Sequence, residues 1–547
     1  MLDTLTTNEN HGTAVLDSAH VGDIKGALGT IAQNDTARRN SWGARWRTLL
    51  AILGPGLIVM VGDNDAGAFS TYTQAGQNYG TTLLWTLTLL IPVLYVNQEM
   101  VLRLGTVTGV GHARLILERF GKFWGAFSVI DLFILNALTI VTEFIGISLG
   151  LDHLGIPRGW GVAVSALLII MAASTGNFRR FERFSLMLVV GSLLLIPVLV
   201  MIHPPLGQLS HDLVVPGMPK DAPLSEVMLL IIAIVGTTVA PWQLFFQQSY
   251  VIDKRITPHF MTYEKIDLVI GIVLVIIGAV AMMGFSAATF AGKPEAGQFV
   301  DAAAVAAGVA KYVGATPAAL FSIALIDASI IGAAAVSLST AYAIGDVLSL
   351  RHSLHRKPKE AKTFYSVYAL LIAIAAALVL IPNAPLGLIT NAVQTLAGVL
   401  LPGASVFLLL LCNDKAVLGP WVNSKYTNLF TGAVVAILVL LSIILTASVL
   451  YPSITSTQIL AILIGGMAMA AVGAASMAIV RRVRGLPAAE VIDRTGREHW
   501  RMPPLEQLPP AQLSMRRRLW LGVLRAYLAA ALIMTIIKVT QMILAKH

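Results

Sequence analysis

Two carboxylates separated by a single residue interrupt the first long apolar stretch of this chain, which reads Gly62-Asp63-Asn64-Asp65-Ala66-Gly67-Ala68. An acidic side chain at mid-membrane costs on the order of 2.5–3.5 kcal/mol even on the lenient insertion scale, so it is a candidate for an ion pathway. A structural kink between the glycines would need no second acid so close by. Asp63, Asn64 and Asp65 carry hard oxygen atoms, which divalent cations such as Mg²⁺ prefer. The pattern predicts a cation site at a broken helix.

A second apolar stretch contains an interruption of another kind, Gly236-Thr237-Thr238-Val239-Ala240-Pro241-Trp242-Gln243. Proline has no N–H, which frees the carbonyl near Thr237 one turn earlier. A proline kink alone is weak evidence. However, interrupted helices at matching places in two halves of a chain indicate a transporter site at a repeat interface. These interruptions fall in the first and sixth apolar stretches, so we expect two halves of five spans, with Thr237 and Gln243 facing the acids.

The elements that must position these residues are membrane helices, because about 20 apolar residues are needed to cross the hydrocarbon core. Twelve runs meet this length: 46–76, 81–102, 123–151, 159–175, 181–202, 225–250, 265–291, 315–350, 364–382, 386–412, 427–449 and 457–480. A thirteenth, 519–543, contains Arg525 and Lys538. We expect it to span the membrane with both cations reaching toward the interface; lying along the interface is the alternative.

The composition agrees with a lipid environment. Hydrophobic residues make up 56% of the 547 residues and charged residues only 12%, with a mean hydropathy of +0.77, whereas soluble domains carry about 25% charged residues. The net charge of +9 does not indicate nucleic-acid binding, because the basic residues lie between apolar runs rather than on one face. The single cysteine, Cys412, excludes an intramolecular disulfide framework and a cysteine-rich zinc site.

Lysine and arginine in the short connections predict the orientation. If residues 1–45 are cytoplasmic, the inner connections hold most of these residues, including Arg103, Arg114, Arg119, Lys122, Arg179, Arg180, Arg183, Lys254, Arg255, Arg351 and Arg356. The outer connections hold few, namely Lys220, Lys293 and Lys311. Residues 1–45 are polar and lack the apolar core of a signal peptide. We predict a disordered cytoplasmic tail over 1–45 and a protein of the cell membrane.

From about Trp46 to Val449 the chain resembles the NRAMP family of divalent-metal transporters. The family's first-helix motif Asp-Pro-Gly-Asn corresponds to Asp65-Ala66-Gly67-Ala68, after Gly54-Pro55-Gly56, and its sixth-helix motif Met-Pro-His corresponds to Ala240-Pro241-Trp242. Further matches are Arg103-Leu104-Gly105 with Thr108-Gly109, Glu143-Phe144-Ile145-Gly146, Arg179-Arg180-Phe181-Glu182, Gln394 with Pro402, and Val422-Asn423-Ser424-Lys425. The resemblance implies an all-α, LeuT-type 5+5 inverted repeat with discontinuous first and sixth helices and alternating access.

The departures from the family pattern bear on the transported ion. Ala68 replaces the family's asparagine, and Ala240 replaces its methionine, the soft ligand that favours transition metals. A wider cavity lined by hard oxygens suits Mg²⁺, which keeps several of its waters. These changes resemble the NRAMP-related magnesium transporters, which carry Mg²⁺ and Mn²⁺. The resemblance therefore implies a metal site of Asp65, Asp63, Asn64, Thr237, Gln243 and Gln394, with Ala68, Ala240, Trp242 and Glu143 setting the pathway and its selectivity.

Proton coupling is predicted to be lost. Trp242 replaces the family's sixth-helix histidine, the natural titrating group. In the third span, Ile140-Val141-Thr142-Glu143 keeps one acid of the family's pair, and we find no basic residue after Lys362 in the ninth. The alternative is a proton-coupled Mn²⁺/Fe²⁺ symporter of the main family type.

Outside the predicted site, Asp131, Asn136 and Asp327 are candidates for helix contacts or for the pathway. Glu143 is an equally good candidate for helix packing and for the pathway. Residues 46–412 are predicted to form the transport core, as repeats 46–202 and 225–412. The remaining segments are two accessory spans in 427–480, a cytoplasmic linker at 481–518 and a final helix at 519–547.

We find no catalytic triad, metal-binding His-x-x-x-His spacing or phosphate loop, so we expect a transporter and not an enzyme, with no cofactor. An organic-solute carrier is disfavoured because paired acids would repel a carboxylate substrate. The predicted partners are divalent metal ions and the lipid bilayer, and oligomeric state is left open.

Overall fold

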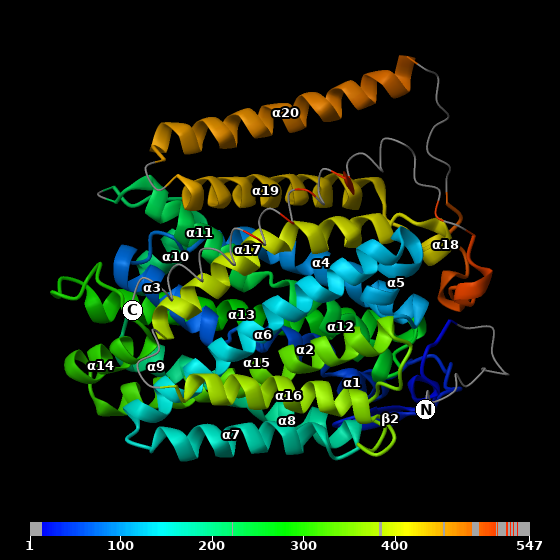
Figure 1. The fold of residues 1–547 in the computed structure, drawn as a ribbon, viewed down its shortest axis with the longest axis horizontal. Coiled ribbons are helices and arrows are strands. Elements are labelled where there is room, and N and C mark those ends of the chain that lie inside the picture. The colour runs from blue at the N-terminus through cyan, green and yellow to red at the C-terminus, as the bar shows by residue number, and fades with distance from the viewer. Residues whose placement is uncertain are drawn as a thin grey trace.

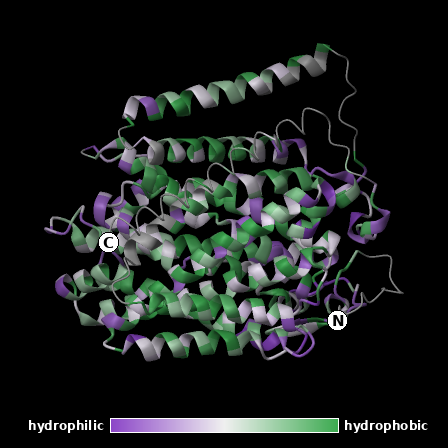
Figure 2. Cartoon of the chain, in the orientation of Figure 1, coloured by the Kyte–Doolittle hydropathy of each residue, from purple (hydrophilic) through white to green (hydrophobic). Residues whose placement is uncertain are grey.

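Long apolar helices run side by side through the computed structural model (Figure 1). The structure describes residues 14–220, 222–381, 386–451, 454–483 and 492–509, with a few single positions beyond. Within this part, nine helices are long and apolar enough to cross a membrane, or up to eleven if each bent pair counts as one span. Figure 2 shows hydrophobic residues along the helices and hydrophilic ones gathered toward the ends of the bundle. The protein is a membrane protein.

The predicted count of twelve or thirteen spans is not reached in the described part of the chain. α7 (Arg158–Ala173) is apolar, but its 16 residues are short for a span. The predicted thirteenth span, 519–543, lies almost entirely outside the described residues, as does most of the predicted final helix at 519–547.

The order of the helices follows the predicted two halves. The first half consists of α2 (Pro55–Val61), α3 (Ala66–Tyr79), α4 (Trp85–Thr108), α6 (Lys122–His153), α7, and α8 (Phe178–Gly191) with α9 (Leu195–Ile202). The second half consists of α11 (Leu224–Thr238), α12 (Pro241–Asp253), α13 (Met261–Phe290), α15 (Ala315–Val347), α16 (Lys362–Val379) and α17 (Leu386–Leu411). Shorter helices connect them: α5 (His112–Phe120), α10 (Leu206–Val214), α14 (Ala302–Tyr312) and α18 (Lys415–Leu418).

Both predicted helix breaks are confirmed. In the first half, residues 62–65 separate α2 from α3, and Asp65 is the extended N-cap residue of α3. In the second half, Val239 and Ala240 leave helical geometry between α11 and α12. Pro241 is then the first residue of α12, a position where its missing N–H costs no hydrogen bond.

Helix α13 lies against both α2 and α3 and so runs past the first break. Its approach to α2 depends on glycine, because a Cβ at Gly56 would lie 2.6 Å from the backbone of Leu268. On the other side of the core, α15 packs along α6 and against α12. The breaks are therefore enclosed by continuous helices, which is the setting in which non-helical backbone is tolerated.

The prediction of a disordered tail over 1–45 is wrong for residues 14–45; residues 1–13 lie outside the described part. A 3₁₀ turn η1 (Ser18–His20) is followed by an antiparallel pair of strands, β1 (Ile24–Gly26) and β2 (Gly29–Ile31), and by α1 (Trp42–Ile52). Ile24 and Ile31 pair across the strands and are buried against α1 and the end of α12. The polar composition of residues 1–45 does not reveal that these two apolar side chains are buried. We call the end of the bundle where residues 14–41 lie the N-terminal face.

Two further helices lie outside the core, at the predicted accessory spans. α19 (Lys425–Leu450) packs on α17, and α20 (Ser456–Val483) packs on α19 and also contacts α11 (Figure 1). Part of the predicted 481–518 linker is described as residues 492–509, and it contacts the core where the Met502 N–H donates to the Val107 carbonyl (3.3 Å).

Candidate cation site at the two helix breaks

The first break holds a buried carboxylate that has no hydrogen-bond partner among the described residues. Asp63 is 1% exposed, and neither of its side-chain oxygens accepts a hydrogen bond there. The neighbouring Asn64 is fixed by donating from Nδ2 to the Val275 carbonyl on α13 (3.1 Å), which leaves its Oδ1 without a partner in the same set of residues. The two carboxylate oxygens of Asp63 and the amide oxygen of Asn64 are thus buried without a hydrogen-bond partner among the described residues.

The second acid, Asp65, is held by the start of α3. The Ala68 N–H donates to Asp65 Oδ1 (2.8 Å), which completes an N-cap. Glu143 on α6 reaches the same helix start, since the Ala66 N–H donates to Glu143 Oε2 (3.2 Å). Glu143 is fully buried, and its Oε1 has no partner among the described residues. Glu143 therefore contacts the start of α3, and its role in the pathway stays a prediction.

The second break adds neutral oxygens and amides. Gln243 on α12 lies by Asp63; its Oε1 accepts from Gln98 Nε2 on α4 (2.9 Å). The Thr237 hydroxyl is buried without a partner in the described part of the chain. The two breaks are tied directly by the hydrogen bond between the hydroxyls of Tyr72 on α3 and Thr238 on α11 (2.7 Å).

The other predicted residues surround the first break. The Gln394 amide of α17 lies over Gly67, where a Cβ would collide with it and would lie 3.1 Å from Asp65 Oδ1. The Trp242 ring lies beside Gly62, 3.7 Å from where a Cβ would stand. Trp242 is 1% exposed, and its predicted role as a wall of the ion cavity stays a prediction. Ala68 and Ala240 are both buried next to the breaks.

The intramembrane candidates outside this group are placed elsewhere. Asn136 makes a helix contact, donating from Nδ2 to Thr340 Oγ1 on α15 (2.9 Å). Asp131 lines a separate small cavity that also includes Phe407, and Asp327 lies against Gly191. Asp131 shares this cavity with Pro241 at the start of α12 and so lies near the second break, whereas Asn136 and Asp327 contact other helices.

Sequence reasoning missed Tyr72, Gln98 and Gln247. Tyr72 and Gln98 contact the second break from other helices, and nothing in their local sequence indicates this. Gln247 carried a usable signal, because it lies one turn beyond Gln243 on α12. Its amide is fully buried, and neither of its polar atoms has a partner among the described residues.

No group of three or more His, Cys, Asp or Glu side chains within the described residues converges at metal-binding geometry. The arrangement at the breaks is instead two carboxylates with amide, hydroxyl and carbonyl oxygens. Such a set can attract a cation strongly while making few direct bonds to it, which suits an ion that keeps part of its water shell.

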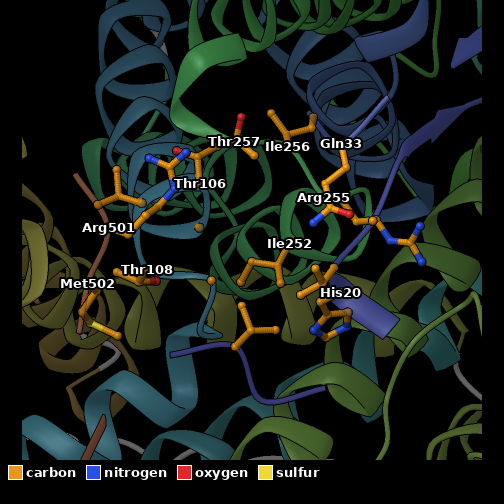
Figure 3. Close-up of a pocket in the computed structure, with 16 residues that line it drawn as sticks. His20, Gln33, Thr106, Thr108, Ile252, Arg255, Ile256, Thr257, Arg501 and Met502 are labelled. Carbon is orange, nitrogen blue, oxygen red and sulfur yellow. The ribbon is translucent and has the colours of Figure 1, made fainter. Parts of the chain in front are cut away.

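A cavity of about 330 Å³ on the N-terminal face does not belong to this site (Figure 3). The end of α4, the end of α12, residues near His20 and the linker around Met502 line it. Its charged lining residues are Arg255 and Arg501, and none of the described lining residues is acidic. The cavity therefore repels cations, and we assign it no role in metal binding.

Two halves of five helices, each opening with a broken helix, define a membrane transporter fold of the LeuT type. A solved structure shares it: the crystal structure of the Eremococcus coleocola manganese transporter, in complex with an aromatic bis-isothiourea substituted compound, superposes with a TM-score of 0.59 at 20% identity, over 82% of this chain and 97% of that one. The sequence profile of Nramp, natural resistance-associated macrophage protein-like, matches residues 56–448, well over half of the chain. The chain belongs to the Nramp family.

Curated relatives agree with this assignment. The divalent metal cation transporter MntH of Ralstonia nicotianae is 29% identical over 403 residues, which cover 70% of this chain and 87% of the relative. MntH of Aeromonas hydrophila is 26% identical over 410 residues, which cover 71% of this chain and 94% of the relative. The similarity extends through both breaks and both halves of the core.

Proposed function

We propose that this protein carries divalent metal cations, Mg²⁺ and Mn²⁺, across the cell membrane by alternating access and without proton coupling. The observation that carries the proposal is the Asp63 carboxylate, which is buried between two helix breaks without a hydrogen-bond partner among the described residues. A buried charge is costly unless it is paired or binds a metal. A passing cation supplies that pairing, and the relatives named divalent metal cation transporters support this cargo.

The preference for Mg²⁺ and Mn²⁺ is supported by the chemistry of the donors. The residues of the two breaks, 62–65 and 239–240, offer oxygen and nitrogen but no thioether, and Ala240 directly precedes α12. Mg²⁺ binds oxygen ligands and gives up its water reluctantly. Asp63, Asp65, Asn64, Gln243, Thr237 and Gln394 are the proposed metal-binding residues, and no resident cofactor is part of the proposal.

The absence of proton coupling is supported by Trp242, which stands beside the first break in place of a titrating residue. The alternative, a proton-coupled Mn²⁺/Fe²⁺ symporter, is favoured by one observation. Glu143 keeps a buried oxygen without a described partner next to the start of α3. Protonation of Glu143 would then accompany metal binding.

The distribution of lysine and arginine in the connections supports a cytoplasmic N-terminus. By that orientation, the N-terminal face is the cytoplasmic end of the bundle, and ions bound at the breaks leave toward it during import.

The test is uptake into proteoliposomes made with the wild-type chain and with Asp65→Ala, with internal pH recorded in the same experiment. Asp327→Asn is a matched control, because it also neutralises an intramembrane acid but lies away from the breaks. We expect Mg²⁺ and Mn²⁺ to compete for uptake by the wild type and by the control, with no uptake by Asp65→Ala and no acidification. Metal-dependent acidification would favour the symporter, and a lack of Mg²⁺ transport at millimolar concentration would remove Mg²⁺ from the proposal.

A further inference from the structure

A second group of buried charged side chains surrounds the start of α2, on the N-terminal face. The Lys254 ammonium at the end of α12 donates to Glu182 Oε1 of α8 (2.6 Å) and to the carbonyls of Ile52 (2.6 Å) and Leu53 (2.8 Å). Both charged side chains are 0% exposed. The Ala27 N–H of the N-terminal hairpin donates to the other oxygen of Glu182 (2.5 Å). The Lys254 ammonium and both carboxylate oxygens of Glu182 therefore all have hydrogen-bond partners within the protein.

Two more acids, one turn apart on α13, join this group. The Gly56 N–H donates to Asp267 Oδ2 (2.6 Å), which fixes Asp267 beside the start of α2. Asp267 Oδ1 and both carboxylate oxygens of Glu264 have no partner among the described residues, although both side chains are fully buried. The hydroxyl of Tyr250 on α12 is also buried without a described partner, within electrostatic reach of both acids.

The charges of this group do not balance. Glu182, Glu264 and Asp267 bring three carboxylates, and Lys254 brings one ammonium. Lys254 is bound to Glu182 and also acts electrostatically on the two acids of α13, but one ammonium group is fewer than the three carboxyl groups. Buried polar groups in folded proteins are nearly always satisfied, so oxygens without a protein partner call for water or an ion. An excess of negative charge selects a cation.

A stripe of polar side chains connects this group with the helix breaks. Gln243, Gln247, Tyr250 and Lys254 follow one another on α12 at spacings of four, three and four residues, which places them on one face of the helix. The stripe begins beside Asp63 and ends at the Lys254–Glu182 pair. Gln243 and Lys254 are 11 positions apart along the chain, a rise of about 16 Å.

Helix α13 gives a second connection between the same two places. Its carbonyl at Val275 holds Asn64 in the first break, and Asp267 and Glu264 lie about two and three turns earlier on the same helix. Helix α13 thus contacts the first break through Val275 and carries the two acids Asp267 and Glu264 beside the start of α2.

We propose that Glu264, Asp267 and Tyr250 form a second binding site for the divalent cation, which receives the ion from the Asp63–Asp65 break on its way to the N-terminal face. The site binds the ion with its water shell, since only two carboxylates and a hydroxyl meet there. The tethered ammonium of Lys254 lies at its border and separates it from Glu182. The inference rests on the proposed function, because the ion is the transported cargo.

The test measures Mn²⁺ binding to the purified full-length chain by electron paramagnetic resonance, in an Asp65→Ala background that disables the first site. We expect this variant to keep a weaker Mn²⁺ site, and the added change Glu264→Gln to weaken it by about 10- to 100-fold. Glu264→Asp, which keeps the charge, restores part of the binding. Asp327→Asn in the same background leaves the binding unchanged, which controls for the loss of an intramembrane acid as such.

Two results overturn the inference: no Mn²⁺ binding by Asp65→Ala, or equal Mn²⁺ binding with and without Glu264→Gln. Failure of the proposed function is separate, since it would appear as a wild-type chain that transports no metal into proteoliposomes. A wild type that transports metal while Glu264→Gln neither binds nor transports differently would overturn only the second site.

Discussion

The two helix breaks have different residues in their non-helical segments, one acidic and the other neutral. The first has Asp63, Asn64 and Asp65 in its unwound segment, whereas the second has only neutral residues around Val239 and Ala240. Both breaks are closed by hydrogen bonds to neighbouring helices, but only the first retains a buried carboxylate without a described partner. In the proposed function, the first break supplies the attraction for a cation, and the second supplies neutral ligands and the shape of the cavity.

If this division is correct, removing charge from the first break has the largest effect. We expect Asp65→Asn to lower metal uptake by more than about 100-fold, since even residues that only support metal ligands cost 10- to 100-fold. Asparagine keeps an oxygen that accepts from the Ala68 N–H, so the α3 cap persists. Uptake in proteoliposomes measures the effect, and a thermal unfolding temperature within a few degrees of the wild type verifies the fold. Near-normal uptake would show that the charge of Asp65 is dispensable.

A second prediction for the first break concerns metal uptake and thermal stability, which we expect to change in opposite directions. We expect Asp63→Asn to lower uptake by about 10- to 100-fold while raising thermal stability, because it removes a buried charge that has no described partner. The two effects have opposite signs, which a merely structural acid would not produce. Uptake and thermal unfolding of the same preparation are compared. A loss of stability would mean that Asp63 is paired in the folded protein.

Changes in the second break should alter selectivity more than rate. Ala240→Met introduces a thioether at the start of α12, which favours soft ions. We expect the ratio of Cd²⁺ to Mg²⁺ uptake to rise about tenfold, equivalent to about 1.4 kcal/mol, while Mn²⁺ uptake continues. Ala240→Leu is the control for side-chain size. An equal shift in both variants would assign the effect to volume rather than to sulfur.

The smallest expected effect concerns the end of α12 at Asp253, where residues of the N-terminal segment pack. There His20 Nε2 lies 3.6 Å from Asp253 Oδ1 and donates to the His352 carbonyl (3.0 Å), while Asp17 pairs with Arg356 (2.5 Å). Burial alone would lower the pKa of His352, but the Asp346 carboxylate at 3.0 Å outweighs it, and the pKa rises to about 9.

A raised pKa means that the stabilisation is complete below the ordinary histidine pKa of about 6.5 and is lost as pH rises through about 9. We therefore expect residues 14–31 to become more accessible to protease between pH 7 and 10. His352→Asn removes most of this pH dependence. The Asp17 pKa is lowered: burial acts to raise it, but hydrogen bonds from Arg356 and the Ala19 N–H prevail. Asp17 therefore stays charged throughout this range, and an unchanged digestion pattern would contradict the role of His352.

The sequence predicted the breaks because glycine, proline and acidic residues in apolar runs have local causes. It could not predict which distant side chains reach them: Tyr72 meets Thr238, and Gln98 meets Gln243, only after the two halves pack. The pairing of Glu182 with Lys254 likewise depends on packing between α8 and α12. The N-terminal hairpin was missed because Ile24 and Ile31 find their apolar surface only in the folded protein.

The central claim is that the acids of the first break bind the transported cation. Anomalous X-ray scattering from crystals soaked with Mn²⁺ tests it most directly, with Asp65→Asn crystals soaked in parallel. We predict a manganese peak between the two breaks, beside Asp65 and Asp63 and facing Gln243, that disappears in Asp65→Asn. A peak located elsewhere in the wild type, or one that persists between the breaks in Asp65→Asn, would contradict the account.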